Sequence, residues 1–514
     1  MPGGQRDGGI AVLTIAETID HARRNFPDRE ALVCGDTRLT FTEVHRRCEQ
    51  VVGAMQALGM RPGDRVAVLA ANCHRFVEAF VALPSGGMVI VPLNYRLADD
   101  ELAAILQDCG ARLLITDRDS GMLADSVERV IRWPDELEAA MAQAAPANLD
   151  GVASPDDVAA LFYTGGTTGK PKGVMLTHAN IVINSFHKTV AVGLRSDEVF
   201  LAAPAMFHVA GIAPLLSLMT LGARTVSYPM FDPAGCLDAI EREDCTMMMP
   251  VPTMLAAMVD EQRRQPRSLP ALRLLGHAAS PISTDLLERA THTFPGVDLA
   301  EFYGATETTA IVTCLHHEED LIDSPLARSC GQPVPGVSVR IAAPDGSEQA
   351  TGEIGEVLIR SGAVMAGYWN NPAATAAALH DGWYRSGDLG YLDGTSHLFL
   401  VDRAKDMIVT GGENVYSIEV ENALASHPDV VEAAVFGVPD ARWGEAVHAL
   451  VVSISPNPNL AAELIAHCRT QIAAFKVPKA IDIRSEPLPK SGPGKVLKRE
   501  LRNPFWKDHD GNLV

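Results

Sequence analysis

A short segment rich in glycine, threonine and lysine constrains this chain more than any other part of its sequence. The segment 161–180 reads LFYTGGTTGKPKGVMLTHAN and lies between two apolar runs. Glycine has no Cβ, so the backbone of such a loop can approach a ligand closely. Threonine hydroxyls can bind phosphate oxygens, and lysines add positive charge. The segment predicts a loop that holds a polyphosphate through Thr164, Gly165, Gly166, Thr167, Thr168, Gly169 and Lys172.

This loop does not follow the Walker A pattern of P-loop nucleotide hydrolases. That pattern requires glycine, four further residues and then Gly-Lys-Ser/Thr. Counting back from Gly169-Lys170 places Thr164 where the first glycine should be, and Pro171 takes the Ser/Thr position that would bind magnesium. We therefore expect ATP chemistry without the P-loop fold. The alternative interpretation is a flexible surface loop with solvated lysines.

The segment resembles the phosphate loop of the acyl-adenylate-forming superfamily, which includes acyl-CoA synthetases, aryl-CoA ligases, nonribosomal adenylation domains and beetle luciferases. The resemblance extends from about Thr14 to Arg502, and further motifs occur in the family order. It implies an α/β fold with a large N-terminal adenylate-forming domain of several subdomains, residues 1–401. A small, mobile α+β C-terminal domain, residues 402–514, would follow, and Lys405 matches the family's hinge.

Length, charge and cysteine content set further bounds. A chain of 514 residues is too long for one ordinary domain, and a formal charge of −21 argues against nucleic acid as the main partner. The nine cysteines are scattered without a C-x-x-C pair, which fits a reducing cytoplasm better than a disulfide framework or a zinc site. The most apolar stretch, 202–223, contains two prolines and a histidine, so we expect a core element and no membrane span.

Hydrophobic patterning predicts alternating helices and short strands. A capped amphipathic helix is expected at 40–58, and an alanine-rich surface helix and linker at 136–152. The C-terminal part reads as a compact α+β unit. The expected strands are 65–69, 88–92, 113–116, 398–401, 430–438 and 446–454, and the expected C-terminal helices are 418–426 and 461–473.

The motif Glu301-Phe-Tyr-Gly-Ala-Thr-Glu307 follows an apolar run. Tyr303 could stack on adenine, Gly304 allows close backbone approach, and Thr306 could bind phosphate. The carboxylate of Glu307 suits Mg²⁺, a hard cation that prefers oxygen ligands. The family resemblance implies the same roles. The alternative is a strand end with a capping Thr-Glu pair.

Two motifs near the expected domain junction resemble family elements. Trp383-Tyr-Arg-Ser-Gly-Asp388 matches the ribose-binding element, because a carboxylate such as Asp388 can accept hydrogen bonds from both ribose hydroxyls. Arg403 could add a ribose or phosphate contact. Gly411 and Gly412 resemble the loop that enters the site during thioester formation and leaves room for the pantetheine arm of CoA.

The C-terminal motif Pro489-Lys-Ser-Gly-Pro-Gly-Lys495 resembles the one whose final lysine serves adenylation. A cation beside the α-phosphate and the attacking carboxylate would offset charge repulsion in the transition state. Lys495 is therefore the leading catalytic candidate. The neighbouring Lys490, Lys498 and Arg499 are interpreted as a solvated basic face.

The substrate pocket is expected at two segments. Met206-Phe-His208 resembles the aromatic-His element beside the acyl site, so His208 is a candidate for catalysis and for the pocket, together with Val209 and Gly211. A lone histidine in an apolar run is more often a core residue. His277, Ala278 and Ala279 occupy the second segment, where small side chains leave space for an acyl group. His277 is unusual there and could narrow or polarise the pocket.

The resemblance implies an ATP-dependent ligase that converts a carboxylic acid to acyl-CoA through acyl-AMP, with ATP, Mg²⁺ and CoA as cofactor and co-substrates. The low aromatic content of 5% favours a fatty acid weakly. An aryl- or cinnamoyl-type CoA ligase and an acyl-AMP ligase that loads a carrier protein stay open. A non-catalytic nucleotide sensor is the alternative from another class. A homodimer is common in the family.

Overall fold

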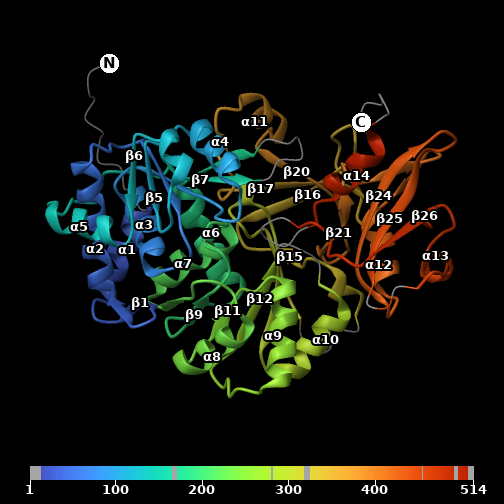
Figure 1. Cartoon of the computed structure of the whole chain (residues 1–514), viewed down its shortest axis with the longest axis horizontal. Coiled ribbons are helices and arrows are strands. Elements are labelled where there is room, and N and C mark those ends of the chain that lie inside the picture. Colours follow the sequence, from blue (N-terminus) through green and yellow to red (C-terminus); the bar gives the residue numbers. More distant parts are fainter. Residues whose placement is uncertain are drawn as a thin grey trace. The chain divides into compact units, whose positions relative to one another are not determined.

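The computed structural model describes residues 13–164, 171–278, 282–317, 324–453, 455, 457–490 and 496–507 (Figure 1). The chain divides into two compact units. The first contains Met1–Ser338 and Ile359–Tyr384, and the second contains Val339–Leu358 and Arg385–Val514. The second unit thus begins well before residue 402. The boundary near Asp402, where the C-terminal domain is expected to turn relative to the rest of the chain, stays a prediction.

The first unit contains a seven-stranded sheet whose central strands run parallel. The edge next to β7 is antiparallel, because β7 and β8 form a hairpin and β18 pairs with β8. In spatial order the strands are β18 (Gly367–Tyr368), β8 (Lys172–Thr177), β7 (Val158–Thr164), β4 (Val89–Pro92), β3 (Arg65–Leu69), β5 (Leu113–Thr116) and β6 (Arg129–Arg132).

A nine-stranded sheet forms the second framework of this unit. Its inner strands are parallel, and β14 runs antiparallel to β13. In spatial order the strands are β15 (Gln332–Pro333), β14 (Thr313–His316), β13 (Asp298–Tyr303), β12 (Leu274–Ala278), β11 (Met247–Met248), β9 (Val199–Ala202), β10 (Arg224–Ser227), β1 (Glu30–Cys34) and β2 (Thr37–Thr40).

A helical layer fills the space between the two sheets. Helix α3 (His74–Ser85) contacts β4 and β7 of one sheet and β1 of the other, and α7 (Val209–Leu221) contacts β10. Helices α1 (Ile15–Asn25) and α6 (His178–Ala191) pack against α7. Helix α2 (Phe41–Ala57) packs on α3, and helix α5 (Asp135–Gln143) packs on α2. The unit is an α/β structure with helices between its sheets.

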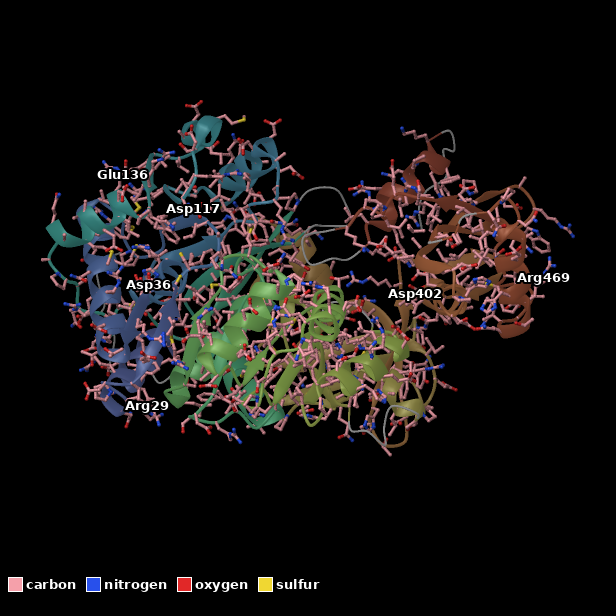
Figure 2. All side chains as sticks on the ribbon, turned by 60° about the horizontal axis from the view of Figure 1, so that its bottom comes forward. Arg29, Asp36, Asp117, Glu136, Asp402 and Arg469 are labelled. Carbon is pink, nitrogen blue, oxygen red and sulfur yellow. The ribbon has the colours of Figure 1, made fainter. Side chains whose placement is uncertain are left out.

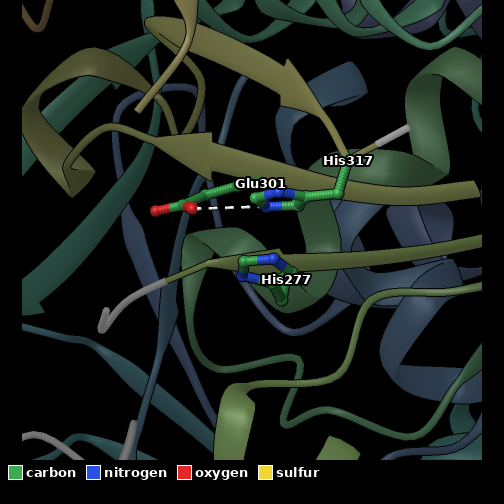
Figure 3. Close-up of side chains that lie close together, drawn as sticks. All are labelled: His277, Glu301 and His317. Atoms are coloured by element: carbon green, nitrogen blue, oxygen red, sulfur yellow. Dashed lines mark ion pairs between the residues drawn. The ribbon is translucent and has the colours of Figure 1, made fainter. Parts of the chain in front are cut away.

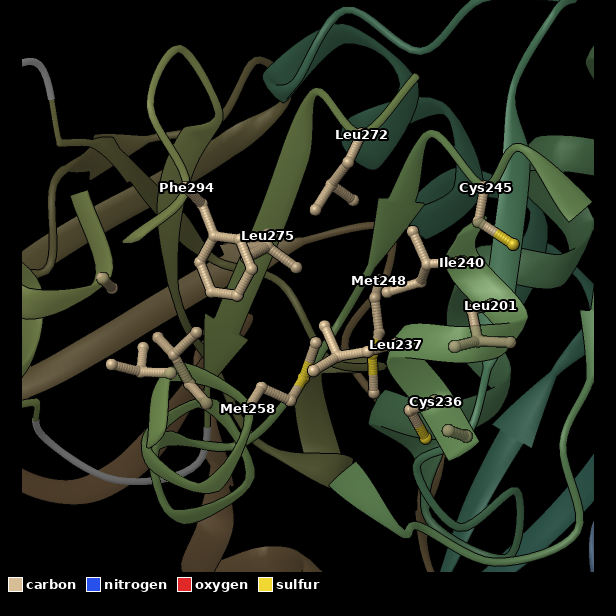
Figure 4. Packing of buried hydrophobic residues seen from close by; sticks show 14 of the residues in the cluster. Leu201, Cys236, Leu237, Ile240, Cys245, Met248, Met258, Leu272, Leu275 and Phe294 are labelled. Atoms are coloured by element: carbon tan, nitrogen blue, oxygen red, sulfur yellow. The ribbon is translucent and has the colours of Figure 1, made fainter. Parts of the chain in front are cut away.

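Further helices cover the outer sheet faces. Leucine and isoleucine side chains of α4 (Asp99–Cys109) share a core with β3, β4 and β5. On the nine-stranded sheet, α8 (Pro233–Glu243), α9 (Pro252–Arg264) and α10 (Thr284–Thr293) pack on β9, β11, β12 and β13 through buried residues that include Leu237, Met258, Leu275 and Phe294 (Figure 4). Fully burying a side chain of this size stabilises a fold by about 1.5–3 kcal/mol.

The second unit contains two further sets of paired strands. The first comprises β16 (Val337–Ala342), β17 (Gly355–Ser361), β20 (Trp383–Leu392) and β21 (Leu398–Arg403), most of whose residues belong to the second unit, whereas the short β19 (Leu379–His380) lies within the residues of the first unit. The second comprises β23 (Glu413–Val415), β22 (Ile408–Thr410), β25 (Gly444–Ser453), β24 (Val430–Asp440) and β26 (Ala480–Arg484). Helices α12 (Ser417–Ala425), α13 (Leu460–Gln471) and α14 (Lys498–Trp506) complete the α+β arrangement.

Most of the predicted elements are confirmed. Helix α2 begins at Thr40, whose hydroxyl accepts the Glu43 amide while the Glu43 carboxylate accepts the Thr40 amide, which is the predicted capped start. Strands β3, β5, β24 and β25 and helices α12 and α13 lie within one or two residues of their predicted bounds. Helix α5 (Asp135–Gln143), followed by residues without helical structure up to 152, agrees with the surface helix and linker predicted at 136–152.

The stretch 202–223 supplies helix α7, most of whose residues are buried. Among the residues that the structure describes, no helix has the length and apolar content needed to cross a membrane.

A cationic side chain lies inside the helical layer. Lys188 on α6 is 4% exposed, and burial lowers the pKa of its amine to about 7. Within the described ranges, no carboxylate forms an ion pair with it. The charged form is therefore destabilised in the folded protein.

Replacing Lys188 by methionine is expected to stabilise the protein, and more strongly at pH 6.5 than at pH 10. A lysine whose folded pKa is depressed to about 7 destabilises the fold fully below that pH, and the penalty declines as pH rises toward the unfolded value of 10.5. We expect a gain of about 1–3 kcal/mol at pH 6.5. Urea unfolding at both pH values measures it, with Lys479→Met on the exposed surface as the control. An equal gain at both pH values would contradict the assignment.

Candidate functional site

The predicted phosphate loop connects two antiparallel strands. Thr164 is the last residue of β7 and pairs directly with Lys172, the first residue of β8, so both lie at the end of the hairpin where the loop joins the strands. A Walker A loop would instead join a strand to a helix. The prediction of a phosphate loop outside the P-loop fold agrees with this hairpin. Gly165, Gly166, Thr167, Thr168 and Gly169 lie outside the described residues.

Tyr368 links the predicted phosphate loop to the predicted metal carboxylate. Its hydroxyl donates a 2.8 Å hydrogen bond to Oε1 of Glu307, and the Lys172 ammonium lies 5.1 Å from the centre of its ring. Burial and the neighbouring carboxylate raise the pKa of the Tyr368 hydroxyl, so it keeps its proton. The structure therefore places Lys172, Tyr368 and Glu307 in one constellation. The sequence analysis missed Tyr368, which is remote in sequence from both motifs.

The segment after β13 carries the other predicted nucleotide contacts. Tyr303 ends the strand, and Thr306 begins a short 3₁₀ turn, Thr306–Thr308; both are partly exposed, as is Glu307. The cap of this turn is made by the Thr308 hydroxyl, which accepts from the Ala305 amide at 2.9 Å. The Glu307 carboxylate bonds Tyr368 in place of a cap, which disfavours the alternative of a capping Thr-Glu pair.

Gly304 is required by the path of its own backbone. A Cβ at this position would lie 1.9 Å from the carbonyl oxygen of Ala310. The chain makes this close return with φ values of 56° at Thr309 and 100° at Ala310, conformations that are costly for residues with side chains. This internal contact explains the glycine, and its predicted close approach to the nucleotide stays a prediction.

A buried amide positions the segment that leads to His208. The Nδ2 group of Asn72 donates to the carbonyl oxygens of Ala202, Ala203 and Pro204, at 2.9–3.2 Å, while its Oδ1 accepts from the Met206 amide at 2.9 Å. Asn72 follows β3 of the seven-stranded sheet, and Ala202 ends β9 of the nine-stranded sheet. No motif pointed to Asn72, because its partners are backbone groups.

His208 is the N-cap residue of α7. Burial lowers the pKa of its ring to about 4, so the imidazole is neutral at physiological pH. Its Nε2 is buried without a hydrogen-bond partner among the described residues. Val209 borders a small apolar cavity with Phe80 and Phe162. At Gly211, a Cβ would lie 2.2 Å from the Ala205 carbonyl oxygen, so this glycine allows α7 to start against the preceding loop.

His277 and Ala278 end strand β12 on opposite faces of the sheet. His277 is 1% exposed and stacks on His317, with ring centroids 5.5 Å apart (Figure 3). Burial and the neighbouring ring lower the pKa of His277 to about 3. Ala278 is partly exposed, and Ala279 lies outside the described residues. The assignment of these three residues to a substrate pocket stays a prediction.

The predicted ribose contacts come together in the second unit. Asp388 on β20 pairs directly with Arg403 on β21, and the Arg403 Nε lies 3.1 Å from the Asp388 Oδ1. Gly387 has a φ of 69°, and the Ser386 hydroxyl accepts the Asp388 amide at 3.0 Å. Asp388 and Arg403 are therefore held together on adjacent strands before any ligand is bound.

A buried polar network follows these strands. Asp402 (labelled in Figure 2) accepts hydrogen bonds from the amide and the hydroxyl of Ser417 at the start of α12. The Lys498 ammonium donates to the Ser417 hydroxyl at 2.6 Å and lies 2.7 Å from the Glu421 carboxylate. Burial raises the pKa of both carboxyl groups, Asp402 and Glu421.

The interpretation of the C-terminal basic residues as a solvated face is wrong for Lys498, whereas Lys490 is exposed. Lys498 is 16% exposed in its side chain and takes part in this network. Lys490 forms an ion pair with Glu432 at 2.6 Å. Arg499 also has an interaction partner. Charge-rich sequence alone does not reveal a carboxylate that is distant in the chain and comes close only in the fold.

The glycine pair forms a tight hairpin turn. Gly411 and Gly412 connect β22 to β23 with φ values of 61° and 87°, the conformation of a type I′ turn. A Cβ on Gly411 would lie 2.7 Å from the Trp443 indole. Lys405, the predicted hinge residue, is exposed and follows β21. Lys495 lies outside the described residues, and Lys490 and Val496 on either side of 491–495 form a β-bridge.

Substituting Asn72 with alanine is expected to destabilise the first unit by about 2–3 kcal/mol, because buried carbonyl groups and the Met206 amide lose their partner. Urea unfolding measures the change. Asn25→Ala, at the exposed end of α1, is the matched control and should change stability by less than about 0.5 kcal/mol. Equal unfolding midpoints for the two variants would show that Asn72 does not anchor the loop before His208.

The chain is similar to known proteins over nearly its whole length. The family model described as AMP-binding enzyme matches residues 19–369, and the AMP-binding enzyme C-terminal domain matches residues 419–495. A feruloyl-CoA synthase from Amycolatopsis sp. is 40% identical over 94% of this chain and 97% of that protein. A fatty acid–[acyl-carrier-protein] ligase, ScoC, from Streptomyces coeruleorubidus is 34% identical over 96% of this chain and 97% of its own.

The fold is also that of solved enzymes. The structure of o-succinylbenzoate coenzyme A synthetase from Bacillus subtilis in complex with ATP and magnesium ion matches with a TM-score of 0.85 and 30% identity, over 94% of this chain and 98% of that one. The predicted superfamily and fold class are thereby confirmed. With two family models that together cover most of its length, the chain belongs to the AMP-binding enzyme family.

Proposed function

We propose that this protein is an ATP-dependent acid–thiol ligase that converts a carboxylic acid to its CoA thioester through an acyl-AMP intermediate. The observation that carries the proposal is the constellation of Lys172, Tyr368 and Glu307, which joins a cation at the phosphate hairpin to a carboxylate suited to Mg²⁺. Relatives that match over nearly their whole length are named as CoA ligases and synthetases.

The residues present fit Mg-ATP. Glu307 is partly exposed, and the described Tyr368 contact uses Oε1. Carboxylate oxygens bind Mg²⁺, and a bound ion would offset the negative charge of the phosphates. The positive charge of Lys172 and the hydroxyl of Thr164 at the hairpin suit a polyphosphate in the same way.

The remaining assignments are proposals for the two half-reactions. Asp388 and Arg403 would hold the ribose, and Lys495 would stabilise charge between the α-phosphate and the attacking carboxylate. The domain from residue 402 onward would then turn at Lys405, so that the hairpin at Gly411 replaces Lys495 for thioester formation. His208 would border the acyl group.

The class of acid has two candidates. The weak preference for a fatty acid rests on the low aromatic content and stays a prediction. The higher identity to a protein named feruloyl-CoA synthase favours an arylpropenoic acid. One relative is named as a ligase of fatty acids to an acyl carrier protein. Transfer of the acyl group to a carrier protein is therefore the second candidate function.

We expect mass spectrometry to detect an acyl-CoA when the full chain is mixed with ATP, Mg²⁺, CoA and a panel of fatty, aryl and cinnamic acids. The acid with the highest kcat/KM identifies the substrate class. Acyl-AMP without acyl-CoA would instead favour carrier loading. Nucleotide binding with neither product across the panel would favour the non-catalytic sensor.

Lys495→Ala should separate the half-reactions. Loss of one group that stabilises a transition state typically lowers the rate by about 10²–10³-fold. We expect that loss in pyrophosphate release from ATP and acid, whereas synthetic acyl-AMP and CoA should still give thioester at a rate near that of wild type. Lys490→Ala, beside Glu432, is the matched lysine control. Adenylation at the wild-type rate in Lys495→Ala would refute the assigned role.

Tyr368→Phe removes only the hydroxyl that bonds Glu307. Loss of the hydrogen-bond partner of a metal-binding carboxylate typically lowers metal affinity by at least about tenfold. We therefore expect the Mg²⁺ concentration for half-maximal adenylation to rise by about that factor. The KM for the acid should change little. Tyr391→Phe, whose ring stacks on Phe399 in the second unit, serves as the control. An unchanged Mg²⁺ dependence would mean that Glu307 is positioned without Tyr368.

We propose a cytoplasmic location, because all nine cysteines are free thiols, as expected for a reducing compartment. The homodimer stays a prediction.

A further inference from the structure

Three side chains that can bind metal ions meet beside the core under α9 and α10. His277, Glu301 and His317 each offer a ligand atom, and these atoms all lie within 4.8 Å of one another. Figure 3 shows the His317 ring stacked on the His277 ring, with the Glu301 carboxylate beside the His317 ring. None of the three belongs to the Lys172, Tyr368 and Glu307 constellation.

The sheet register brings these residues together. His277 on β12 pairs directly with Glu301 on β13, so their side chains share one face. Glu301 also pairs with Leu315 on β14, and His317 lies two residues further on the same face. Leu275 and Leu299, two residues before His277 and Glu301, belong to the core packed by α8, α9 and α10. The three ligands therefore lie near the carboxyl ends of β12 and β13, next to an apolar core.

The two imidazole rings form no hydrogen bonds with the described residues. Both ring nitrogens of His277 and both of His317 are buried without a partner in the part of the chain that the structure describes. The Glu301 carboxylate lies 3.6 Å from His317 Nε2, which is longer than a normal hydrogen bond. An unpartnered buried polar group costs about 1–3 kcal/mol. A ligand that accepts lone pairs from both rings would remove this cost.

The geometry points to a site for a divalent transition-metal ion, Zn²⁺ in the first instance, bound by His277, Glu301 and His317. Two imidazoles and one carboxylate are a ligand set that Zn²⁺ uses, and a water molecule can complete a tetrahedron. Ligands about 2.0–2.1 Å from a tetrahedral ion are about 3.3–3.4 Å apart. The Glu301 to His317 distance of 3.6 Å is already near that value, and the other ligand atoms, within 4.8 Å of one another, need to close by at most about 1.4 Å.

Binding also requires a local change in ring orientation. The rings of His277 and His317 are stacked with an angle of 12° between their planes. An imidazole lone pair lies in the plane of its ring, so the rings must turn to point at a common ion. Once the rings and the Glu301 carboxylate share one ion, β13 would be held in place at Glu301, two residues before Tyr303. The ion would then stabilise the strand that leads into the predicted adenine contact.

The test is metal binding to the purified full chain, stripped with a chelator and kept free of Mg²⁺ and nucleotide. We expect one equivalent of Zn²⁺ to bind with a Kd in the micromolar range or below, and to raise the unfolding temperature. His277→Gln and His317→Gln should each weaken binding at least about tenfold. Co²⁺ in the same site should give visible ligand-field bands without a thiolate charge-transfer band, a readout on the unmodified protein that does not depend on how the variants fold.

Two control variants identify other sources of binding. His380→Gln removes an exposed histidine of the first unit and should leave binding unchanged. Glu307→Gln removes the proposed Mg²⁺ carboxylate and should also leave it unchanged, which separates this proposal from the proposed ligase function. Binding lost in Glu307→Gln, a Co²⁺–thiolate band, or equal affinity in wild type and His317→Gln would each overturn the site. Absence of stoichiometric binding would do the same.

Discussion

The hydrogen bond from the Tyr368 hydroxyl to the Glu307 carboxylate joins the two frameworks of the first unit. Tyr368 belongs to the edge of the seven-stranded sheet, whereas Glu307 follows β13 of the nine-stranded sheet. The helical layer separates most of the two sheets, so contact between them depends on loops and edge strands. Further links include Asn72, which bonds the end of β9, and the Met365 amide, which donates to the Glu307 carbonyl oxygen at 2.8 Å. These links hold the hairpin that is predicted to bind phosphate, the Glu307 carboxylate that is proposed to bind Mg²⁺, and the segment before His208 relative to one another.

Local patterns in the sequence predicted much of the fold, because the forces that set those elements act over a few residues. The capping pair Thr40 and Glu43 and the apolar run of β3 are examples. The candidate site was predicted as a set of motifs, and the pairings Thr164 with Lys172 and Asp388 with Arg403 agree with their proposed shared functions. These motifs are recognisable because each is contiguous.

Interactions between distant residues were not predictable in this way. Tyr368 bonds a residue 61 positions away, and Asn72 bonds backbone carbonyls about 130 positions away, which leave no trace in residue identity. Lys498 looked like surface charge because its partners Ser417 and Glu421 are remote in the chain. The sequence indicated that Gly304 needs close approach of its backbone, but it did not show that the group in the way of a side chain is the carbonyl of Ala310. Register and burial decide these cases, and both are properties of the assembled fold.

The network around Ser417 limits how the second unit can move. Asp402 precedes Lys405 and Ser417 follows it, yet the two are hydrogen-bonded to each other. A swivel centred on Lys405 must break those bonds, whereas a pivot in the chain before Asp402 would leave them intact. Lys498 ties the first turn of α14 to the same serine. The proposed turn at Lys405 therefore requires both Asp402–Ser417 hydrogen bonds to break, and the Lys498 contact would make α12 and α14 move together.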